Sequence, residues 1–227
     1  IIARNVLPHV ANTHDFIKGI CKVLDDNGLL VLEVHYAKEI YEQLHYDSVY
    51  HEHLCYFTLK SLRNLLDQYG LSILDISISP ISGGSLVIYA KKGKVKQLPI
   101  VNSYVKAEAA SKVNTLKGWK DFANRVKSHR KKLLEILKEN KNKTMVGYGA
   151  SARSSTLINY CKIGKEFISV IADQNPLKQG CFTAGTHIFI DSPDNVMKKN
   201  PSFVIILAWN FEKEIIKILK DKYDHNG

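Results

Sequence analysis

Long hydrophobic runs are missing from this 227-residue sequence. No stretch approaches the roughly 18 consecutive apolar residues that a membrane-spanning helix needs, and no basic segment followed by an apolar one opens the chain. Hydrophobic residues nevertheless make up 45% of the composition, enough for a sizeable core in about two domains. We therefore expect a soluble, cytoplasmic protein that has no membrane partner.

Cysteines are few, and they do not form the pairs that bind structural zinc. Cys21, Cys55, Cys161 and Cys181 stand far apart without a C-x-x-C pair, which supports neither a zinc ribbon nor a disulfide framework. An initiator Met is also missing, and the opening Ile1-Ile2-Ala3 is typical of a strand already under way. We expect the chain to be the C-terminal portion of a longer protein.

Acidic residues are outnumbered, because 32 Lys and Arg oppose 22 Asp and Glu for a net charge of +10. Such an excess can indicate contact with nucleic-acid phosphates. Much of it lies between Lys112 and Lys143, where basic residues alternate at helical spacing with apolar ones such as Trp119, Phe122 and Leu133. We interpret this stretch as the solvated face of a long helix and expect no nucleic-acid partner.

The first hundred residues follow the order strand, helix, strand, polar insert, helix, strand, strand. An amphipathic helix capped by Asn12 or Thr13 precedes an apolar run, 29–34, that predicts a strand buried on both faces. Thr58 can cap a second helix, and the two strands after it are joined through Gly83-Gly84. This order suits the second half of an open α/β sheet that ends in an antiparallel pair.

A second domain follows a Lys-rich and Pro-containing boundary at 91–99 and helical patterns over 103–140. Strands are predicted at 144–148, 167–172 and 203–207, each leading toward a helix or a turn. Strands that alternate with helices predict a small parallel, Rossmann-like sheet. The carboxyl ends of its strands should face a ligand.

The densest patch of potential chemistry is the run Tyr50-His51-Glu52-His53. Because the histidine pKa of about 6.5 lets the ring take and return a proton near neutrality, a His beside a Glu is typical of a general base with its orienting partner. A zinc site at His51 and His53 and a solvated aromatic loop are the other interpretations of these residues.

The glycine turn Gly147-Tyr148-Gly149-Ala150 is a second candidate site. Backbone N–H groups at a helix N-terminus can bind phosphate, and glycine lets a ligand come close. Asp173, at the end of the next strand, stands where dinucleotide folds place an acidic group on a ribose hydroxyl. The pattern suits a nucleotide, but a tight strand-to-helix turn without a ligand explains the glycines equally well.

Six segments, in order over nearly the whole chain, resemble the sugar C-methyltransferases, which methylate nucleotide-linked keto-deoxysugars with S-adenosylmethionine. The segments are Arg4–His9, Tyr46–His53, Gly83–Ser85, Gly147–Ala150, Asp173–Gly180 and Ala208–Asn210. Among them, the Tyr-His-Glu-His and Trp-Asn blocks are the more specific.

The resemblance implies both the fold and the cofactors. Residues 1–98 would be the C-terminal part of a class I S-adenosylmethionine methyltransferase domain, 99–140 connecting helices, and 141–227 a Rossmann-like domain that binds the nucleotide-sugar. The main S-adenosylmethionine-binding loop and a zinc-binding domain would belong to a segment upstream of this chain. The chain by itself is therefore not expected to catalyse the reaction.

The resemblance also implies catalytic roles. Carbon becomes nucleophilic when a base removes the proton next to a ketone and donors stabilise the resulting enolate. We expect His53 to be that base, Glu52 to orient it, and Tyr50 to donate a hydrogen bond to the keto oxygen. His9, after the opening strand, would bind the sugar or assist proton transfer.

Binding roles follow in the same way. Arg4 and Asn5 would lie beside the methionine end of the cofactor. The expected substrate-binding residues are Gly149, Ala150 and Ser151, which would offer N–H groups to the pyrophosphate, Lys178, which would add charge, and Asn210, which would close the cleft.

One departure from the family lies after the glycine turn. Where the family usually continues with a Lys-Gly-Asn-like sequence, this chain has Arg153-Ser154-Ser155. Arg keeps a positive charge that can bind phosphate, carried on a rigid, planar guanidinium, and the missing glycine would change how closely a sugar or pyrophosphate approaches.

Two alternatives to the methyltransferase function are open. One is a catalytically silent nucleotide-sugar-binding module, and the other is an NAD-dependent oxidoreductase built on Gly147, Gly149 and Asp173.

Overall fold

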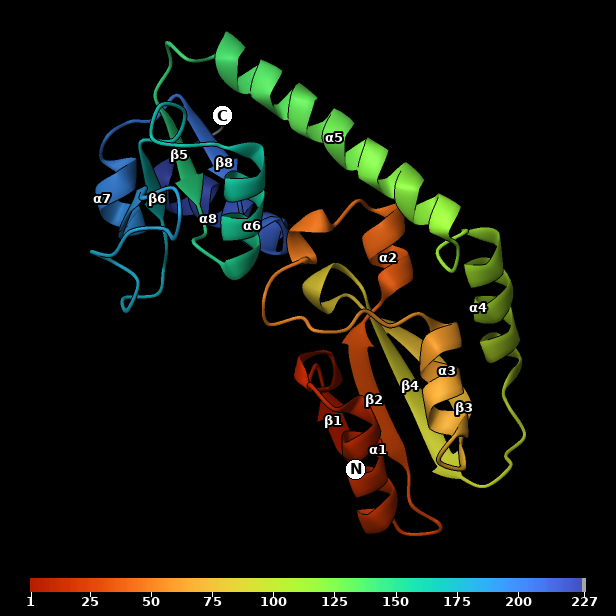
Figure 1. Cartoon of the computed structure of the whole chain (residues 1–227). Helices are drawn as coiled ribbons and strands as arrows, with labels where there is room; N and C mark the ends of the chain where they lie inside the picture. The colour runs from red at the N-terminus through yellow and green to blue at the C-terminus, as the bar shows by residue number, and fades with distance from the viewer. Residues whose placement is uncertain (226–227) are drawn as a thin grey trace. The chain divides into compact units, whose positions relative to one another are not determined.

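The computed structural model describes residues 1–225, apart from the side chain of Ser82. Contacts within the chain divide it into two units. The first unit contains residues 1–46 and 51–125, and the second contains everything from Val126 onward together with the short segment Asp47–Tyr50. Helices and strands alternate in both units (Figure 1), which confirms the predicted α/β class.

The first unit is built on a four-stranded sheet of order β1-β2-β4-β3. Its strands are β1 (Ile2–Arg4), β2 (Leu30–His35), β3 (Leu71–Ser79) and β4 (Ser85–Lys92). β1 and β2 are parallel, whereas β4 runs antiparallel to both β2 and β3. This confirms the expected open sheet that ends in an antiparallel pair.

The helices of the first unit begin at the caps that the sequence predicts. Asn12 caps α1 (Thr13–Val23) by accepting the Asp15 N–H, and Thr58 caps α3 (Leu59–Asp67) in a reciprocal capping box with Ser61. The remaining helical elements are α2 (Ala37–Glu42), α4 (Pro99–Ala110) and the 3₁₀ turns η1 (Leu7–His9), η2 (Tyr46–Ser48, counted in part with the second unit) and η3 (Ile81–Gly83).

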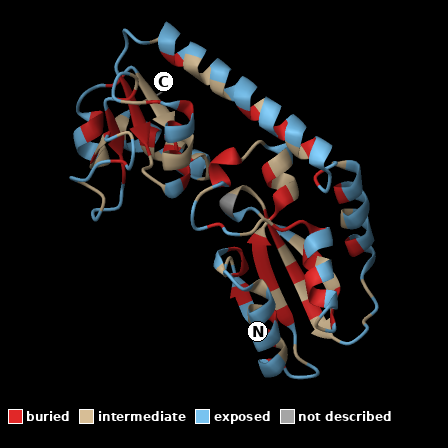
Figure 2. Cartoon of the chain, viewed as in Figure 1, coloured by how far each residue is buried: buried red, intermediate tan, exposed pale blue. Residues whose placement is uncertain are grey.

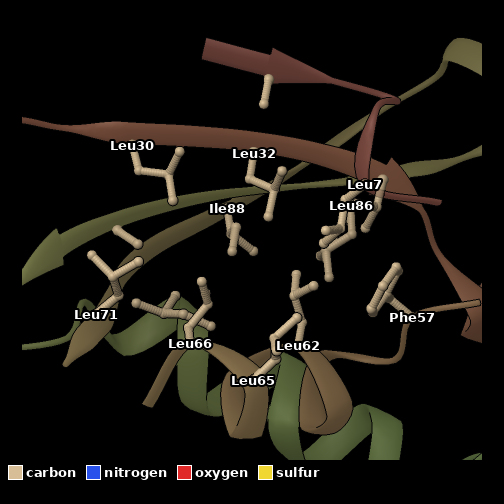
Figure 3. Packing of buried hydrophobic residues seen from close by; sticks show 14 of the residues in the cluster. Leu7, Leu30, Leu32, Phe57, Leu62, Leu65, Leu66, Leu71, Leu86 and Ile88 are labelled. Atoms are coloured by element: carbon tan, nitrogen blue, oxygen red, sulfur yellow. The ribbon is translucent and has the colours of Figure 1, made fainter. Parts of the chain in front are cut away.

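Apolar side chains from the sheet and from α3 form the core of the first unit. Leu30 and Leu32 of β2 and Ile88 of β4 point toward Leu62 and Leu66 of α3, and all five are fully buried (Figure 3). Burial of one such side chain contributes about 1.5–3 kcal/mol. The near-continuous apolar run of β2 therefore marks a strand that lies inside the unit, as predicted.

The second unit is built on a four-stranded parallel sheet of order β7-β6-β5-β8. Its strands are β5 (Met145–Tyr148), β6 (Val170–Ala172), β7 (Phe189–Asp191) and β8 (Phe203–Ile206). Its helices are α6 (Ala152–Cys161), α7 (Pro193–Met197) and α8 (Glu212–Tyr223), with the 3₁₀ turn η4 (Trp209–Phe211) before α8. The Rossmann-like sheet is confirmed, and β7 and α7 are additions to the prediction.

Both faces of this sheet are covered. Val170 and Ile171, consecutive in β6, belong to different hydrophobic clusters because successive strand residues point to opposite faces. Ile158 of α6 packs in the cluster of Ile171, and Ile215 of α8 packs in the cluster of Val170. The strands carry near-continuous apolar sequence for this reason.

The long helix α5 (Leu116–Glu139) contains the boundary between the two units. Lys120, Lys131 and Lys138 on it are exposed, whereas Phe122 and Leu137 are buried. Figure 2 shows the helix as mostly exposed, with buried patches along its length. The basic stretch is therefore a solvated helix face, as predicted. Within residues 1–225, no helix is long and apolar enough to cross a membrane.

Candidate functional site

Three histidines of the first unit meet at the carboxyl ends of β1 and β2. His9 ends η1, directly after β1, and His35 is the last residue of β2. The ring of His53 lies between these two positions, with centroids 5.0 Å from His9 and 4.6 Å from His35. Carboxyl ends of parallel strands are where α/β folds bind ligands.

Backbone hydrogen bonds fix the loop that carries His53. The N–H groups of Leu54 and Cys55 both donate to the Pro8 carbonyl, at 2.9 and 3.2 Å. Further along, the Ala37 N–H donates to the Phe57 carbonyl at 2.9 Å. The loop is thereby tied to η1 at one point and to the start of α2 at the next, which places His53 at the strand ends.

The environment of His53 differs from that of its sequence neighbours. His53 is 7% exposed, whereas His51 and Glu52 lie at the surface. Tyr56 completes the aromatic surroundings of His53, with ring centroids 6.2 Å apart. The structure thus brings His53 and His9 together, while Glu52 lies on the surface and Tyr50 belongs by its contacts to the second unit.

His35 and Tyr56 were not chosen from the sequence. The signal for His35 was its position, because it ends a buried strand at the ligand-binding edge. In the described part of the chain, no group of three or more His, Cys, Asp or Glu side chains is arranged to bind a metal ion.

Arg4 and Asn5 lie at the end of β1, next to Glu33 of β2. The Arg4 Nε donates to Glu33 Oε2 at 2.7 Å, and Asn5, in a left-handed conformation with φ of 51°, donates its N–H to the Glu33 carbonyl. Within the described residues, Asn5 Oδ1 and Glu33 Oε1 are buried and accept no hydrogen bond. These two oxygens could accept hydrogen bonds from a ligand that carries N–H donors.

A cavity of about 310 Å³ lies in the second unit, at the carboxyl ends of β5 and β6. Gly149, which has φ of +97°, forms part of its wall, and a Cβ there would lie 2.4 Å from the Ala208 Cβ. The lining residues are Tyr148, Gly149, Ser151, Asp173, Gln174, Asn175, Lys178, Ala208, Phe211, Glu214, Ile215 and Ile218. Three of the five predicted substrate-binding residues, Gly149, Ser151 and Lys178, are among them.

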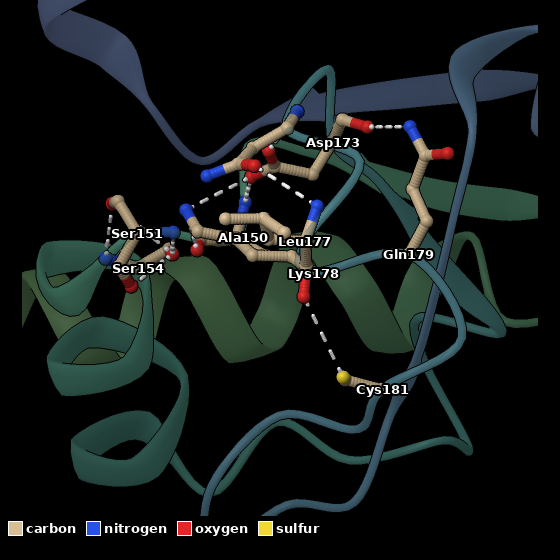
Figure 4. A network of polar contacts seen from close by, with 9 residues as sticks. Ala150, Ser151, Ser154, Asp173, Leu177, Lys178, Gln179 and Cys181 are labelled. Carbon is tan, nitrogen blue, oxygen red and sulfur yellow. Dashed lines mark hydrogen bonds and ion pairs between the residues drawn. The ribbon is translucent and has the colours of Figure 1, made fainter.

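The N–H groups that were expected to bind pyrophosphate already have partners. Gly149 donates to the Ala172 carbonyl at 2.7 Å, Ala150 to Asp173 Oδ2 at 2.7 Å, and Ser151 to Ser154 Oγ at 2.6 Å. Their role in binding pyrophosphate therefore stays a prediction, and in this structure the buried Asp173 carboxylate lies beside α6, where it accepts the Ala150 N–H (Figure 4).

Lys178 and Asn210 also differ in part from their expected roles. The Lys178 Nζ donates to the Ala150 carbonyl at 2.7 Å and lies 3.4 Å from Asp173 Oδ2, so an internal carboxylate partly neutralises its charge. Asn210 is half-buried in η4, and the residues from this part of the chain that line the cavity are Ala208 and Phe211.

Two family models match the chain. Residues 1–76 match a methyltransferase domain, and residues 80–227 match the C-methyltransferase C-terminal domain. These matches, with which the open sheet and its antiparallel pair are consistent, place the chain in the methyltransferase class. Within that class, the chain belongs to the C-methyltransferase family, as its resemblance to that family predicted.

A curated relative is similar over the same range. The C-methyltransferase NovU of Streptomyces niveus is 29% identical over 231 residues, which cover 100% of this chain and 55% of NovU. The chain therefore spans about half the length of this relative. Membership in a methyltransferase family implies S-adenosylmethionine as the methyl donor.

Proposed function

We propose that the protein to which this chain belongs methylates a carbon of a nucleotide-linked keto-deoxysugar, with His53 as the base. The observation that supports this best is the burial of His53 between His9 and His35 at the strand ends. A buried imidazole among aromatic neighbours is shielded from water, and a base in such a site can abstract a weakly acidic C–H proton.

In this mechanism, His53 takes the proton from the carbon next to the ketone. The electrons of the C–H bond move into the C–C bond, and the ketone becomes an enolate whose negative charge is on oxygen. His9, which is exposed beside His53, or Tyr50 would donate a hydrogen bond to that oxygen. Bound S-adenosylmethionine supplies a methyl carbon made electrophilic by its sulfonium.

The cofactor part of the proposal concerns the methionine end alone. The ammonium group of that end is a hydrogen-bond donor, and Asn5 Oδ1 and Glu33 Oε1 are buried acceptors without a partner in the described part of the chain. The ammonium group therefore suits these two oxygens as a hydrogen-bond donor. Arg4, which already pairs with Glu33, would orient that carboxylate.

The second unit would bind the nucleotide part of the substrate in its cavity. Phe211, Ile215 and Ile218 provide apolar surface for a base, and the Asp173 carboxylate can accept a hydrogen bond from a ribose hydroxyl. Lys178 is the cation among the lining residues and would face the phosphates.

Methyl transfer by the full-length protein tests the base assignment. The substrates are a keto-sugar linked to thymidine diphosphate and labelled S-adenosylmethionine, and H53A should lose on the order of a hundredfold or more in rate. H51A is the matched control, because His51 is the exposed neighbour and its loss should change the rate only slightly. If H53A kept near wild-type transfer and α-proton exchange with solvent, His53 would not be the base. If the wild type bound the nucleotide-sugar but transferred no methyl group, the protein would be a binding module.

A further inference from the structure

A buried polar cluster in the second unit joins parts of the chain that are far apart in sequence. The Trp209 Nε1–H donates to Asp47 Oδ2 at 2.6 Å, across 162 positions. The Arg153 guanidinium lies over the Trp209 ring, 5.4 Å from its centroid. Asp47 is 5% exposed and Arg153 9%, whereas Trp209 is half-buried, so the two charged residues of the cluster are almost fully withdrawn from water.

The charges of this cluster depend on one another. Burial raises the pKa of Asp47, and the Trp209 hydrogen bond and the positive charge of Arg153 oppose that rise. Burial likewise lowers the pKa of Arg153, and the Asp47 carboxylate opposes that fall. Buried charged groups are weak evidence for stability, but they can specify one arrangement of the chain.

One part of the cluster comes from a short segment, Asp47–Tyr50, that interrupts the first unit in the sequence. Asp47 and Ser48 make their contacts with the second unit, although the residues just before and just after Asp47–Tyr50 belong to the first. His51, Glu52 and His53 follow directly after the segment Asp47–Tyr50, so whatever fixes this segment also limits where the next residues can lie.

We propose that Trp209 and Arg153 are positioning residues that anchor the segment Asp47–Tyr50 through the Asp47 carboxylate. Arg153 then packs its guanidinium over the Trp209 ring, and the Trp of the Trp-Asn block contributes its indole N–H to Asp47. The anchoring rests on these contacts alone. Its consequence for catalysis, the placement of Tyr50 and of the loop that follows, rests on the proposed function.

Amide hydrogen exchange of the full-length protein tests the anchor directly. In W209F, which keeps a ring but loses the N–H donor, the amides of Asp47–Tyr50 should exchange about tenfold faster or more. W119F is the matched control, because the Trp119 Nε1–H also donates a single bond, to the Val113 carbonyl at 2.7 Å in the first unit. Unchanged exchange in W209F, or an equal increase in W119F, would overturn the anchor.

A second variant guards against general unfolding. D47N keeps the shape of the side chain and removes the charge opposite Arg153, so the same amides should again exchange faster while those of β5 and α6 stay protected. If amides throughout the second unit of W209F exchanged faster, that variant would be generally destabilised, and the test of the anchor would rest on D47N alone. Unchanged exchange in D47N would then rule the anchor out.

Kinetics test the consequence for catalysis. In W209F and D47N, kcat should fall about tenfold or more while the affinity for thymidine diphosphate stays the same, and R153K should retain more activity than R153A. Faster exchange with unchanged kcat would keep the anchor and reject its role in catalysis. A wild type without methyl transfer would reject the proposed function, and the exchange experiment would still decide the anchor.

Discussion

The His53 ring stands edge-on to the His35 ring, with centroids 4.6 Å apart and an angle of 81° between the planes. His35 is fixed by its strand, where it pairs with Ser85 of β4. The His35 ring therefore forms part of the surroundings in which His53 would act. A neutral imidazole is the form that can accept a proton from substrate.

From this contact we predict that H35F of the full-length protein loses about tenfold or more in kcat for methyl transfer. Phe keeps an aromatic ring against His53 but removes both ring nitrogens. The comparison is H14F, because His14 on α1 also contacts an aromatic side chain, Tyr69, but is itself exposed. Equal rates for H35F and the wild type would mean that His35 only fills space beside His53.

Much of the fold followed from local signals. The apolar run of β2 and the capping residue Thr58 predicted a buried strand and the start of α3, because both depend on neighbours within a few positions. β7 and α7 escaped prediction because they have only three and five residues, too few for a hydrophobic period to show.

The candidate site was less predictable, since its partners are distant in sequence. His9 and His53 could be chosen by residue type, but their contact depends on the Pro8 carbonyl bonding the loop after His53. The N–H groups of the glycine turn were expected to be available, because nothing near them in the sequence shows that Asp173 would accept one of them. Such hydrogen-bond partners are distant in sequence and come together only when the sheet has folded.

Glu108 belongs to α4, and its buried carboxylate lies at the first residues of α3. It is 2% exposed and accepts hydrogen bonds from the Leu59 and Lys60 N–H groups at 2.5 and 2.9 Å, from the Tyr36 hydroxyl at 2.9 Å, and from the Asn114 side chain at 2.8 Å. Burial, together with this carboxylate, raises the pKa of Tyr36.

We therefore predict that E108Q lowers the free energy of unfolding of the first unit by about 2–4 kcal/mol, because an amide NH₂ would face groups that are themselves donors. Urea unfolding followed by the fluorescence of Trp119, in a W209F background, measures this. E42Q is the control: Glu42 forms an exposed ion pair with Lys38, and its loss should change stability by about 0.5 kcal/mol or less. Similar effects of E108Q and E42Q would contradict a structural role for Glu108.

Gly149 and Gly180 provide a matched pair of left-handed glycines in the second unit. Gly149 has φ of +97° and a neighbour, the Ala208 Cβ, at 2.4 Å from an added Cβ, whereas Gly180 has φ of +83° and no heavy atom within 4 Å of such a Cβ. G180A should cost about 1–2 kcal/mol from the backbone alone. G149A should cost about 1–3 kcal/mol more, because the added methyl group overpacks the turn.

Urea unfolding in a W119F background, where Trp209 fluorescence reports on the second unit, compares the two glycine variants. The difference between them measures the close approach of the glycine turn to Ala208. If G149A were no less stable than G180A, that contact would be relaxed at little cost, and glycine at position 149 would serve the backbone conformation only.

The Asp47 carboxylate should make the second unit less stable as the pH rises. Because burial raises the folded-state pKa of Asp47 above the ordinary 3.8, the folded protein binds this proton more readily than the unfolded chain. The free energy of unfolding therefore falls as the pH rises from 3.8 through the raised pKa, relative to D47N, which has no proton to lose there. The measurement is urea unfolding of wild type and D47N at several pH values.

Other carboxylates do not obscure this comparison. The pKa of Asp191 is lowered by hydrogen bonds from the Asn195 side chain and the Ser192 N–H, so its contribution has the opposite sign and is lost as the pH falls. It is the same in wild type and D47N, and it cancels in their difference. A constant difference would mean that Arg153 and Trp209 balance the burial of Asp47, and a difference that grew with pH would mean that they outweigh it.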